Sequence, residues 1–409
     1  MRKLYFLCLL LIVLASGFAL YGHHAVYRYP ALAIDPNVKA LSYQHQNKWL
    51  VSASGAYFKT GQSLKLRAFE PQVTLRIHAK TAVDSLRLEV ENIHPQAQLK
   101  IAGIDAAQIQ EASSGLSRSI TIASLPPDTQ VSIRWQFPQK NSYRFVAIGD
   151  TGGDRELSWG LERAAQLDAD FVLHMGDAYY DISEHALVGD YLNDSSIPVY
   201  TANGNHDFQG PEGNIIDAFL RDVGPLNASF SLLGHCFINL DTGAFMYPAG
   251  KGERSALLAA EIVNHRRNPS QCSDYIVFTH KPMVLDFEAP FPQQDHALYS
   301  WHARPLIKQL QQLGSVTIIA GHIHSDFEFE QDGMKTYVTG SGLAHRDLLS
   351  GKKNAKVLIG EITAGQPLTL TWAYNEMPLE YHCSKRLHRA FLEAGNPLSN
   401  VFEKCQSEK

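Results

Sequence analysis

The strongest constraint on the fold is a series of nearly continuous apolar runs that each end in a polar motif. These runs are "YRFVAIGD", "FVLHMGD", "IPVYTANGNHD", "DYIVFTH" and "VTIIAGHIH", with "CFINLDT" between the third and the fourth. Such runs are typical of strands buried on both faces of a sheet. Helical patterns, "RELSWGLERAAQL", "ERSALLAAEIVNHR" and "RPLIKQLQQL", lie between several of them. The alternation predicts an α/β domain, which "KTYVTGSG", "KVLIGEIT" and "LTLTWAY" complete with further strands.

Two of the helix starts can be predicted from local signals. Glu253 and Arg254 are expected to begin the second helix, and Pro305 suits the first turn of the third.

Residues 28–138 have a different pattern, in which short runs alternate apolar and polar side chains with period two. They are "SLKLRAFE", "VTLRIHAK", "SLRLEVEN", "QLKIAG", "SITIAS" and "VSIRWQF". This pattern predicts a small antiparallel β-sandwich, whose default interpretation is a spacer or docking module. Residues 138–142 are expected to link it to an α/β domain over residues 143–375, with a C-terminal tail over residues 376–409.

The polar motifs supply a set of side chains suited to metal ions. They are Asp150 in "GDTGG", Asp177 in "GDAYYD", Asn205 and His206 in "GNHD", His280 in "FTHKP", and His322 and His324 in "GHIH". In an open α/β sheet, ligands bind beyond the carboxyl ends of the strands, so the motifs are expected to converge. Oxygen ligands suit hard cations and imidazole suits transition metals. The set exceeds the needs of one ion, and two ions that share a carboxylate would use it fully.

The order GD…GD…GNH…TH…GHxH resembles that of the calcineurin-like metallophosphoesterases, over roughly residues 143 to 345. The forms GDxG and GDxxY resemble purple acid phosphatases of the small, tartrate-resistant kind. The resemblance implies a four-layer αββα sandwich that follows the β-sandwich.

The resemblance also implies a role for each matching residue. Asp150, Asp177, Tyr180 and His324 would hold the first ion, an Fe(III) in purple enzymes. Asp177 would bridge to a second ion, Fe, Zn or Mn, which Asn205, His280 and His322 would also hold. His206 would lie outside the ligand set and face the substrate.

The two tyrosines of "GDAYYD" have unequal claims to be ligands. Family members that lack the tyrosine usually have a histidine two residues after the first aspartate, where this chain has Gly152. This favours Tyr180 as the replacement ligand, whereas Tyr179 is expected to pack. A tyrosinate has a reference pKa of about 10, so a tyrosine ligand argues for a trivalent cation.

The remaining candidates are expected to have lesser roles. We interpret His174 as structural, His185 as a surface group, and Asp207 and Asp241 as residues that brace loops. His296 and His345 follow ligand-bearing strands, and either is a candidate contact for phosphate.

The N-terminus and the cysteines favour an exported protein. Arg2 and Lys3 precede an apolar run to Leu20, the pattern of a signal peptide, and an uncleaved membrane anchor over residues 1–20 is the alternative. Four cysteines follow that segment, and an even number suggests two disulfides, for which we favour Cys236–Cys272 and Cys383–Cys405. Four free thiols are the alternative.

The formal net charge of −5 and the lack of a long basic run argue against a nucleic-acid partner. The expected function is cleavage of phosphate monoesters by attack of metal-bound hydroxide, as in acid phosphatases, with His206 orienting the substrate or protonating the leaving oxygen. The substrate would be a phosphorylated small molecule or another phosphoester. The alternatives are a phosphodiesterase with divalent Mn or Zn and a non-catalytic envelope binding protein.

Overall fold

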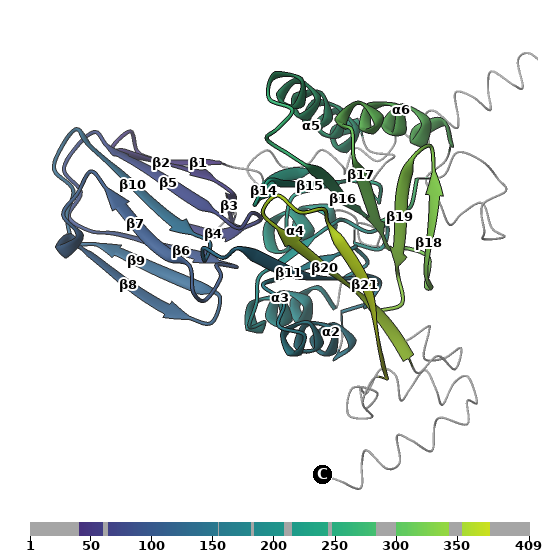
Figure 1. The fold of residues 1–409 in the computed structure, drawn as a ribbon. Coiled ribbons are helices and arrows are strands. Elements are labelled where there is room, and N and C mark those ends of the chain that lie inside the picture. The colour runs from purple at the N-terminus through teal and green to yellow at the C-terminus, as the bar shows by residue number, and fades with distance from the viewer. Residues whose placement is uncertain are drawn as a thin grey trace, which may run out of the picture.

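The computed structural model describes residues 41–59, 64–153, 155–180, 184–207, 215–243, 248–283, 300–342 and 354–376. The segment 1–20, the pair Cys383–Cys405, His296 and His345 lie outside these residues. None of the helices in the described ranges is both long and apolar enough to cross a membrane. The described chain forms two β-rich parts that lie side by side (Figure 1).

The N-terminal part consists of two five-stranded sheets packed face to face. The first has the order β1-β2-β5-β10-β7 and contains β1 (Ser42–His45), β2 (Trp49–Ser54), β5 (Val73–Ala79), β10 (Thr129–Gln136) and β7 (Gln98–Ala102). The second has the order β3-β4-β6-β9-β8 and contains β3 (Ala56–Phe58), β4 (Lys65–Ala68), β6 (Leu86–Glu91), β9 (Ser117–Ile122) and β8 (Ile109–Ser114). All six alternating runs of the sequence are strands in this sandwich.

One strand pair departs from the expected antiparallel pattern, because β4 and β6 are parallel. The strand between them in sequence, β5, belongs to the opposite sheet. The chain therefore passes from β4 to the opposite sheet and back, so that β6 runs in the same direction as β4.

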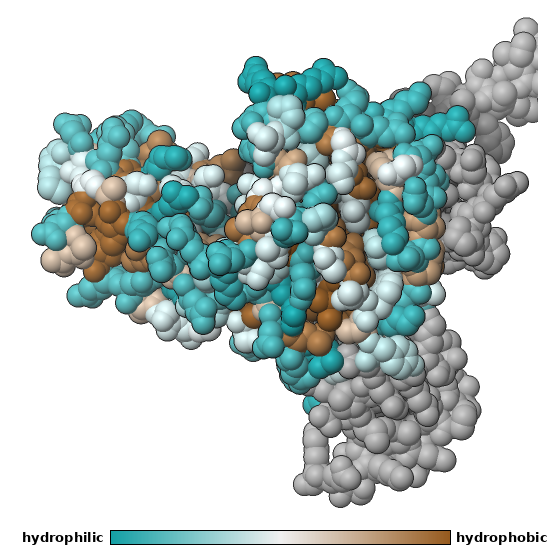
Figure 2. Space-filling model, viewed as in Figure 1, coloured by the Kyte–Doolittle hydropathy of each residue, from teal (hydrophilic) through white to brown (hydrophobic). Residues whose placement is uncertain are grey.

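The sandwich core follows directly from the period of the strands. Along β5 the side chains alternate between buried and more exposed positions, with Val73, Leu75 and Ile77 inside. Trp135 of β10 is fully buried in the same core. Burial of each such side chain stabilises the fold by roughly 1.5–3 kcal/mol. Figure 2 shows a mainly hydrophilic surface, with a group of apolar residues visible near β7.

The second part contains two mixed sheets. The five-stranded sheet has the order β13-β12-β11-β20-β21 and contains β13 (Val199–Thr201), β12 (Phe171–His174), β11 (Ser142–Ile148), β20 (Asn354–Thr363) and β21 (Thr369–Glu376). The six-stranded sheet has the order β14-β15-β16-β17-β19-β18 and contains β14 (Ala228–Leu232), β15 (His235–Leu240), β16 (Asp274–Thr279), β17 (Val316–Ala320), β19 (Met334–Thr339) and β18 (Asp326–Gln331). The strands that lead to the motifs are parallel within each sheet.

Helices cover the outer faces of both sheets, so this part has four layers, αββα (Figure 1). On the five-stranded sheet lie α2 (Arg155–Gln166), α3 (His185–Asp194) and α4 (Ile215–Asp222). On the six-stranded sheet lie α5 (Pro248–Arg267) and α6 (Ser300–Leu310). The inner layer between the sheets is rich in aromatic side chains, and Phe145 contacts Phe237 across it edge to face at 5.6 Å. This arrangement is the fold class that the sequence predicted.

Two predicted helix starts are wrong. The helix expected at Glu253 begins at Pro248, and α6 begins at Ser300, so that Pro305 lies inside the helix. The fixed φ angle of proline is compatible with a helical backbone beyond the first turn as well. A proline in a helical pattern therefore does not by itself show where the helix begins. Pro305 lies on the exposed face of α6, away from the sheet.

The predicted Cys236–Cys272 disulfide is confirmed. It joins the beginning of β15 to the segment that precedes β16, and both cysteines are buried against the α5 and α6 layer. It therefore crosslinks two neighbouring parallel strands at their starting ends, remote from the motifs.

Candidate metal centre

The predicted ligands lie just beyond the carboxyl ends of the strands, in unusual backbone conformations. Asp150, Asp177 and His322 have φ angles of 58°, 53° and 67°. Residues other than glycine rarely adopt this left-handed region, and such outliers cluster at functional sites. A side chain at Gly204 would place its Cβ only 2.1 Å from the backbone nitrogen of Asp177. The loops are thus packed so closely that this neighbour must be glycine.

Asp150, Tyr180 and His324 form the first group of candidate ligands. The Tyr180 hydroxyl lies 3.2 Å from His324 Nε2, and this nitrogen lies 3.6 Å from Asp150 Oδ1. Asp150 is fully buried, whereas Tyr180 and His324 are partly exposed. The group therefore has a buried carboxylate at its base and an open side.

Asp177, Asn205, His280 and His322 form the second group. His280 Nε2 lies 3.0 Å from Asn205 Oδ1, 3.1 Å from His322 Nδ1 and 3.5 Å from Asp177 Oδ1. Ligand atoms held about 2.1 Å from a single transition-metal ion lie about 3.0–3.4 Å apart. The spacing within both groups fits such ions.

The tautomer of His280 supports this interpretation. Its Nδ1 lies 2.8 Å from the Met175 carbonyl, which accepts only, so Nδ1 carries the proton. Burial, and then the charge of His322, lowers the pKa of His280 well below its usual value, so the ring is neutral. Its unprotonated Nε2 faces the carbonyl oxygen of the Asn205 amide and the Asp177 carboxylate. A cation between these electron-rich atoms would satisfy all of them.

The two groups are joined at several points. The backbone N–H of His322, in the second group, donates to Asp150 Oδ2 of the first at 2.7 Å. The backbone N–H of His206 donates to Asp177 Oδ1 at 2.9 Å. The His206 ring packs edge to face on the Tyr180 ring at 4.7 Å and is partly exposed. His206 thus lies beside both groups, on the side open to solvent.

Asp207 holds the loop of Asp177 in place, as the sequence predicted for a residue that braces loops. Its Oδ2 accepts from the backbone of Gly204 at 2.7 Å and of Asp177 at 2.9 Å, and its Oδ1 accepts from that of Tyr179 at 3.2 Å. Tyr179 is fully buried, and its hydroxyl donates to the Asp207 carbonyl at 2.6 Å. The expectation that Tyr179 packs is therefore confirmed.

His174 has the structural role that the sequence predicted. Its Nδ1 accepts from the Gly176 N–H at 3.2 Å, and its Nε2 lies 3.0 Å from Thr151 Oγ1, next to Asp150. Burial lowers the pKa of His174 to about 3, so the ring remains neutral. It links the loops that carry Asp150 and Asp177.

The sequence did not predict the buried contacts of two charged residues, Glu184 and Arg254. The buried Glu184 carboxylate accepts from the backbone N–H of Tyr180 at 2.8 Å and of Gly153 at 3.3 Å. The buried Arg254 donates through Nη1 to the Asp241 carbonyl. Neither belongs to a motif, and a charged residue beside a helical pattern normally indicates a solvated face.

The expectation that His185 is a surface group is wrong. Its Nε2 lies 3.4 Å from Asp222 Oδ2, and its ring packs on Tyr179 at 5.4 Å. The first turn of α3 turns this side chain toward α4 rather than to solvent, which a polar sequence context cannot reveal.

Comparisons with known proteins agree with this geometry. Residues 143–326 match the family model described as calcineurin-like phosphoesterase. A search of curated proteins found no match.

The chain is also similar to several solved structures. GAP50, the anchor in the inner membrane complex of Plasmodium, has a TM-score of 0.43 at 14% identity, over 58% of this chain and 89% of its own. Purple acid phosphatase PPD1 from yellow lupin seeds has a TM-score of 0.43 at 14% identity, over 78% and 72%. A dimetal phosphatase from Danio rerio has a TM-score of 0.39 at 13% identity, over 58% and 99%.

Proposed function

Because residues 143–326 belong to the calcineurin-like phosphoesterases, we propose that this protein hydrolyses phosphate monoesters with two metal ions, in the manner of an acid phosphatase. The observation that carries the proposal is the pair of ligand groups around Asp177. The group Asp177, His280 and His322 has ligand atoms within 4.8 Å of one another. The first group, Asp150, Tyr180 and His324, lies at the other side of the same loops.

In this proposal Asp150, Tyr180 and His324 hold the first ion, and Asn205, His280 and His322 hold the second, with Asp177 bridging the two. The Tyr180 oxygen supports Fe(III) in the first position, because a trivalent ion stabilises a phenolate far better than a divalent ion does. Imidazole and carboxamide suit Fe, Zn or Mn in the second.

When bound, the two ions would supply Lewis acidity that activates the attacking water and stabilises charge on the phosphoryl oxygens. The chain's own residues would orient the reaction. His206 lies at the open side of the centre, where its ring can donate a hydrogen bond to the ester and protonate the leaving oxygen. Its position is fixed from both sides, because its backbone N–H is bonded to Asp177 and its ring packs on Tyr180.

The centre also stays defined without substrate. The buried supports Asp207, Glu184 and His174 fix the loops that carry the ligands before any ester arrives. Preorganisation of this kind keeps ligands and substrate groups in productive geometry.

A substrate screen tests the proposal. The full chain, supplied with defined Fe, Zn or Mn, would be assayed against aryl monoesters and diesters between pH 4 and 9, a range set roughly by the ionisation of metal-bound water. We expect monoesters to be cleaved faster than diesters, with an optimum on the acidic side. Preference for diesters with Mn would support a phosphodiesterase instead, and no cleavage with any metal would support a binding protein.

We further propose that the protein works outside the cytoplasm. The Cys236–Cys272 disulfide supports this location, because disulfides persist mainly in oxidising compartments. Fractionation of cells that express the full chain tests it, and a cytoplasmic protein with a reduced Cys236 would contradict it.

A further inference from the structure

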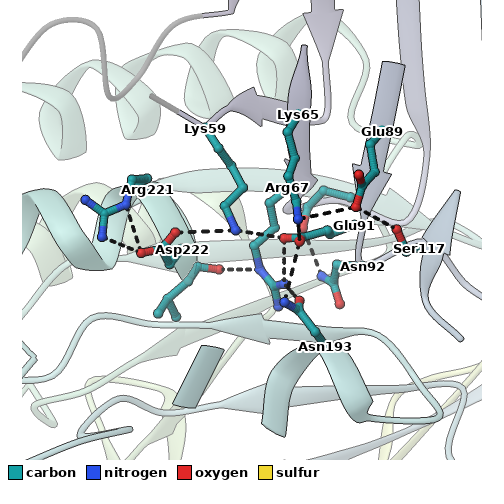
Figure 3. A network of polar contacts seen from close by, with 12 residues as sticks. Lys59, Lys65, Arg67, Glu89, Glu91, Asn92, Ser117, Asn193, Arg221 and Asp222 are labelled. Carbon is teal, nitrogen blue, oxygen red and sulfur yellow. Dashed lines mark hydrogen bonds and ion pairs between the residues drawn. The ribbon is translucent and has the colours of Figure 1, made fainter. Parts of the chain in front are cut away.

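Buried polar side chains form a connected network at the contact between the β-sandwich and the phosphoesterase domain (Figure 3). Arg67 and Asn92 of the sandwich are 4% and 2% exposed, although neither lies in the core of its own domain. Buried polar groups of this kind destabilise the fold unless they form hydrogen bonds, so both residues need partners.

Asn92 completes the edge of a sheet in the other domain. Its Nδ2 donates to the Val199 carbonyl at 2.9 Å, and its Oδ1 accepts from the Val199 N–H at 3.0 Å. The same Nδ2 donates to the Ala68 carbonyl of β4 at 2.9 Å. Val199 begins β13, the outermost strand of the five-stranded sheet. The amide thus supplies the pair of hydrogen bonds that a further strand would make.

The opposite end of β13 leads to the metal centre. The strand ends at Thr201, and Asn205 and His206 follow within the same tight loop. On the inner side, the Ala202 N–H donates to the His174 carbonyl at 2.7 Å. Pairing with β12 holds this short strand on its inner side, and Asn92 adds two hydrogen bonds on its outer edge.

Arg67 attaches the sandwich to two helices that also lead toward the centre. Its Nε donates to the Val223 carbonyl, just after α4, at 3.1 Å, and its Nη1 donates to Asn193 Oδ1 in α3 at 2.7 Å. Glu184, directly before α3, holds the backbone of Tyr180. The sandwich therefore contacts α3 near its C-terminal end, while Glu184, at its N-terminal end, bonds to the backbone of Tyr180.

An ion pair of Lys59 also joins the two domains. Lys59 Nζ lies 3.0 Å from Glu91 Oε2 in the sandwich and 3.3 Å from Asp222 Oδ1 in α4 (Figure 3). Both lysine and glutamate side chains are less than 10% exposed. Loss of a partner strongly destabilises a buried charge, and separation of the domains here would remove one of the two carboxylate partners of Lys59.

We infer that Asn92 is a positioning residue for the second metal site. By holding Val199 it sets the place of Asn205, whose Oδ1 lies 3.0 Å from His280 Nε2. The inference rests on the proposed dinuclear function. It makes the sandwich a working part of the phosphoesterase unit instead of a spacer.

Two substitutions at Asn92 and one control test the inference. Asn92 has a φ angle of 64°, so Asn92→Gly removes the amide without straining the backbone. Asn92→Asp keeps the acceptor for Val199 but loses the donor. Val90→Ala, two residues earlier in β6, removes a fully buried core side chain without touching the interface.

The full chain of each variant would be stripped of metal and titrated with Zn²⁺ in a calorimeter, with circular dichroism to confirm folding. We expect two bound ions in the wild type and in Val90→Ala. In both Asn92 variants the weaker dissociation constant should rise about tenfold, as for residues that orient a ligand.

Unchanged Zn²⁺ affinity in the Asn92 variants would overturn the inference, and so would a loss like theirs in Val90→Ala. Failure of both Asn92 variants to fold would make the residue purely structural and would also overturn it. Two bound Zn²⁺ without cleavage of any phosphate ester would instead contradict the proposed function and leave the positioning role intact.

Discussion

Tyr179 and Tyr180 are neighbours in the chain but lie in different surroundings. Burial, and then the charge of Asp207, raises the pKa of Tyr179 well above its usual value, so it remains a protonated packing residue. Tyr180 reaches His324 at the open side of the centre. The family resemblance made this distinction predictable. Tyr180 occupies the last position of GDxxY, and Gly152 stands where family members without the tyrosine usually have a histidine. The support Glu184 belongs to no motif, and its contacts required the fold.

Substitution of Tyr180 should change metal binding, whereas substitution of Tyr179 should not. In Tyr180→Phe we expect loss of the phenolate-to-Fe(III) absorption band and a lower kcat, because the first ion loses a ligand. Tyr179→Phe should keep the band and lose about 1–2 kcal/mol of stability, the cost of leaving the Asp207 carbonyl without its donor. Absorption spectra and thermal unfolding of both variants make the comparison. An iron-free, colourless wild type would contradict the assignment.

His206→Asn should lower kcat by about 10²–10⁴-fold if the imidazole protonates the leaving oxygen. The loss should be smaller for a nitrophenyl ester, whose leaving group needs no proton, than for an alkyl ester. Metal content should not change, because His206 is outside both ligand groups. An equal loss for both esters would show that His206 only orients the substrate.

At the scale of elements, prediction succeeded where the hydrophobic pattern was long and failed where elements were short. The strands β11, β12, β16 and β17 are buried on both faces and appear as apolar runs. In contrast, β8 is mostly exposed, β3 has only three residues, and α4 has eight. Their existence depends on neighbours from distant parts of the sequence, as does the crossover that makes β4 and β6 parallel.

The disulfide should stabilise the pair of strands that it joins. It closes a loop of 36 residues between β15 and β16, for which chain entropy predicts about 3–4 kcal/mol. Cys236→Ala combined with Cys272→Ala should lower the unfolding free energy by that order, while metal binding at the opposite strand ends persists. Chemical unfolding of the double variant, compared with each single variant, measures the effect. Equal stability of wild type and double variant would contradict a structural role.

At the scale of the molecule, the two-domain organisation could be expected from the change of pattern near residue 140, but the contact between the domains could not. Arg67 alternates with apolar neighbours like an ordinary strand residue, and Asn92 directly follows β6, where a polar residue is common, so neither is marked as interfacial. Their partners Val199 and Val223 are separated from them by more than a hundred residues, as the bonds that join them show.

The boundary between the domains should also respond to acid. Burial lowers the pKa of His94 to about 4, and its ring packs on Phe137, directly before the linker, at 4.8 Å. Between about pH 6.5 and pH 4 the unfolded chain binds a proton at this site that the folded chain does not. Stability should therefore fall as pH falls through this window, by about 3 kcal/mol for this group.

The substitution His94→Gln should remove that share of the pH dependence. Urea unfolding of wild type and variant at pH 7 and pH 4 measures it. If both proteins lost the same free energy between the two pH values, His94 would not be the group responsible.

We propose that Asp177 bridges two metal ions, so the metal content of the full chain should depend on this carboxylate. Wild type and Asp177→Asn would be loaded with the same metals, dialysed and measured by mass spectrometry, with circular dichroism to confirm that both are folded. We predict two ions per wild-type chain, and in the folded variant the loss of at least one ion with weaker retention of the other. A wild-type chain that retains fewer than two ions, or a variant that retains both, would contradict a bridging role of Asp177.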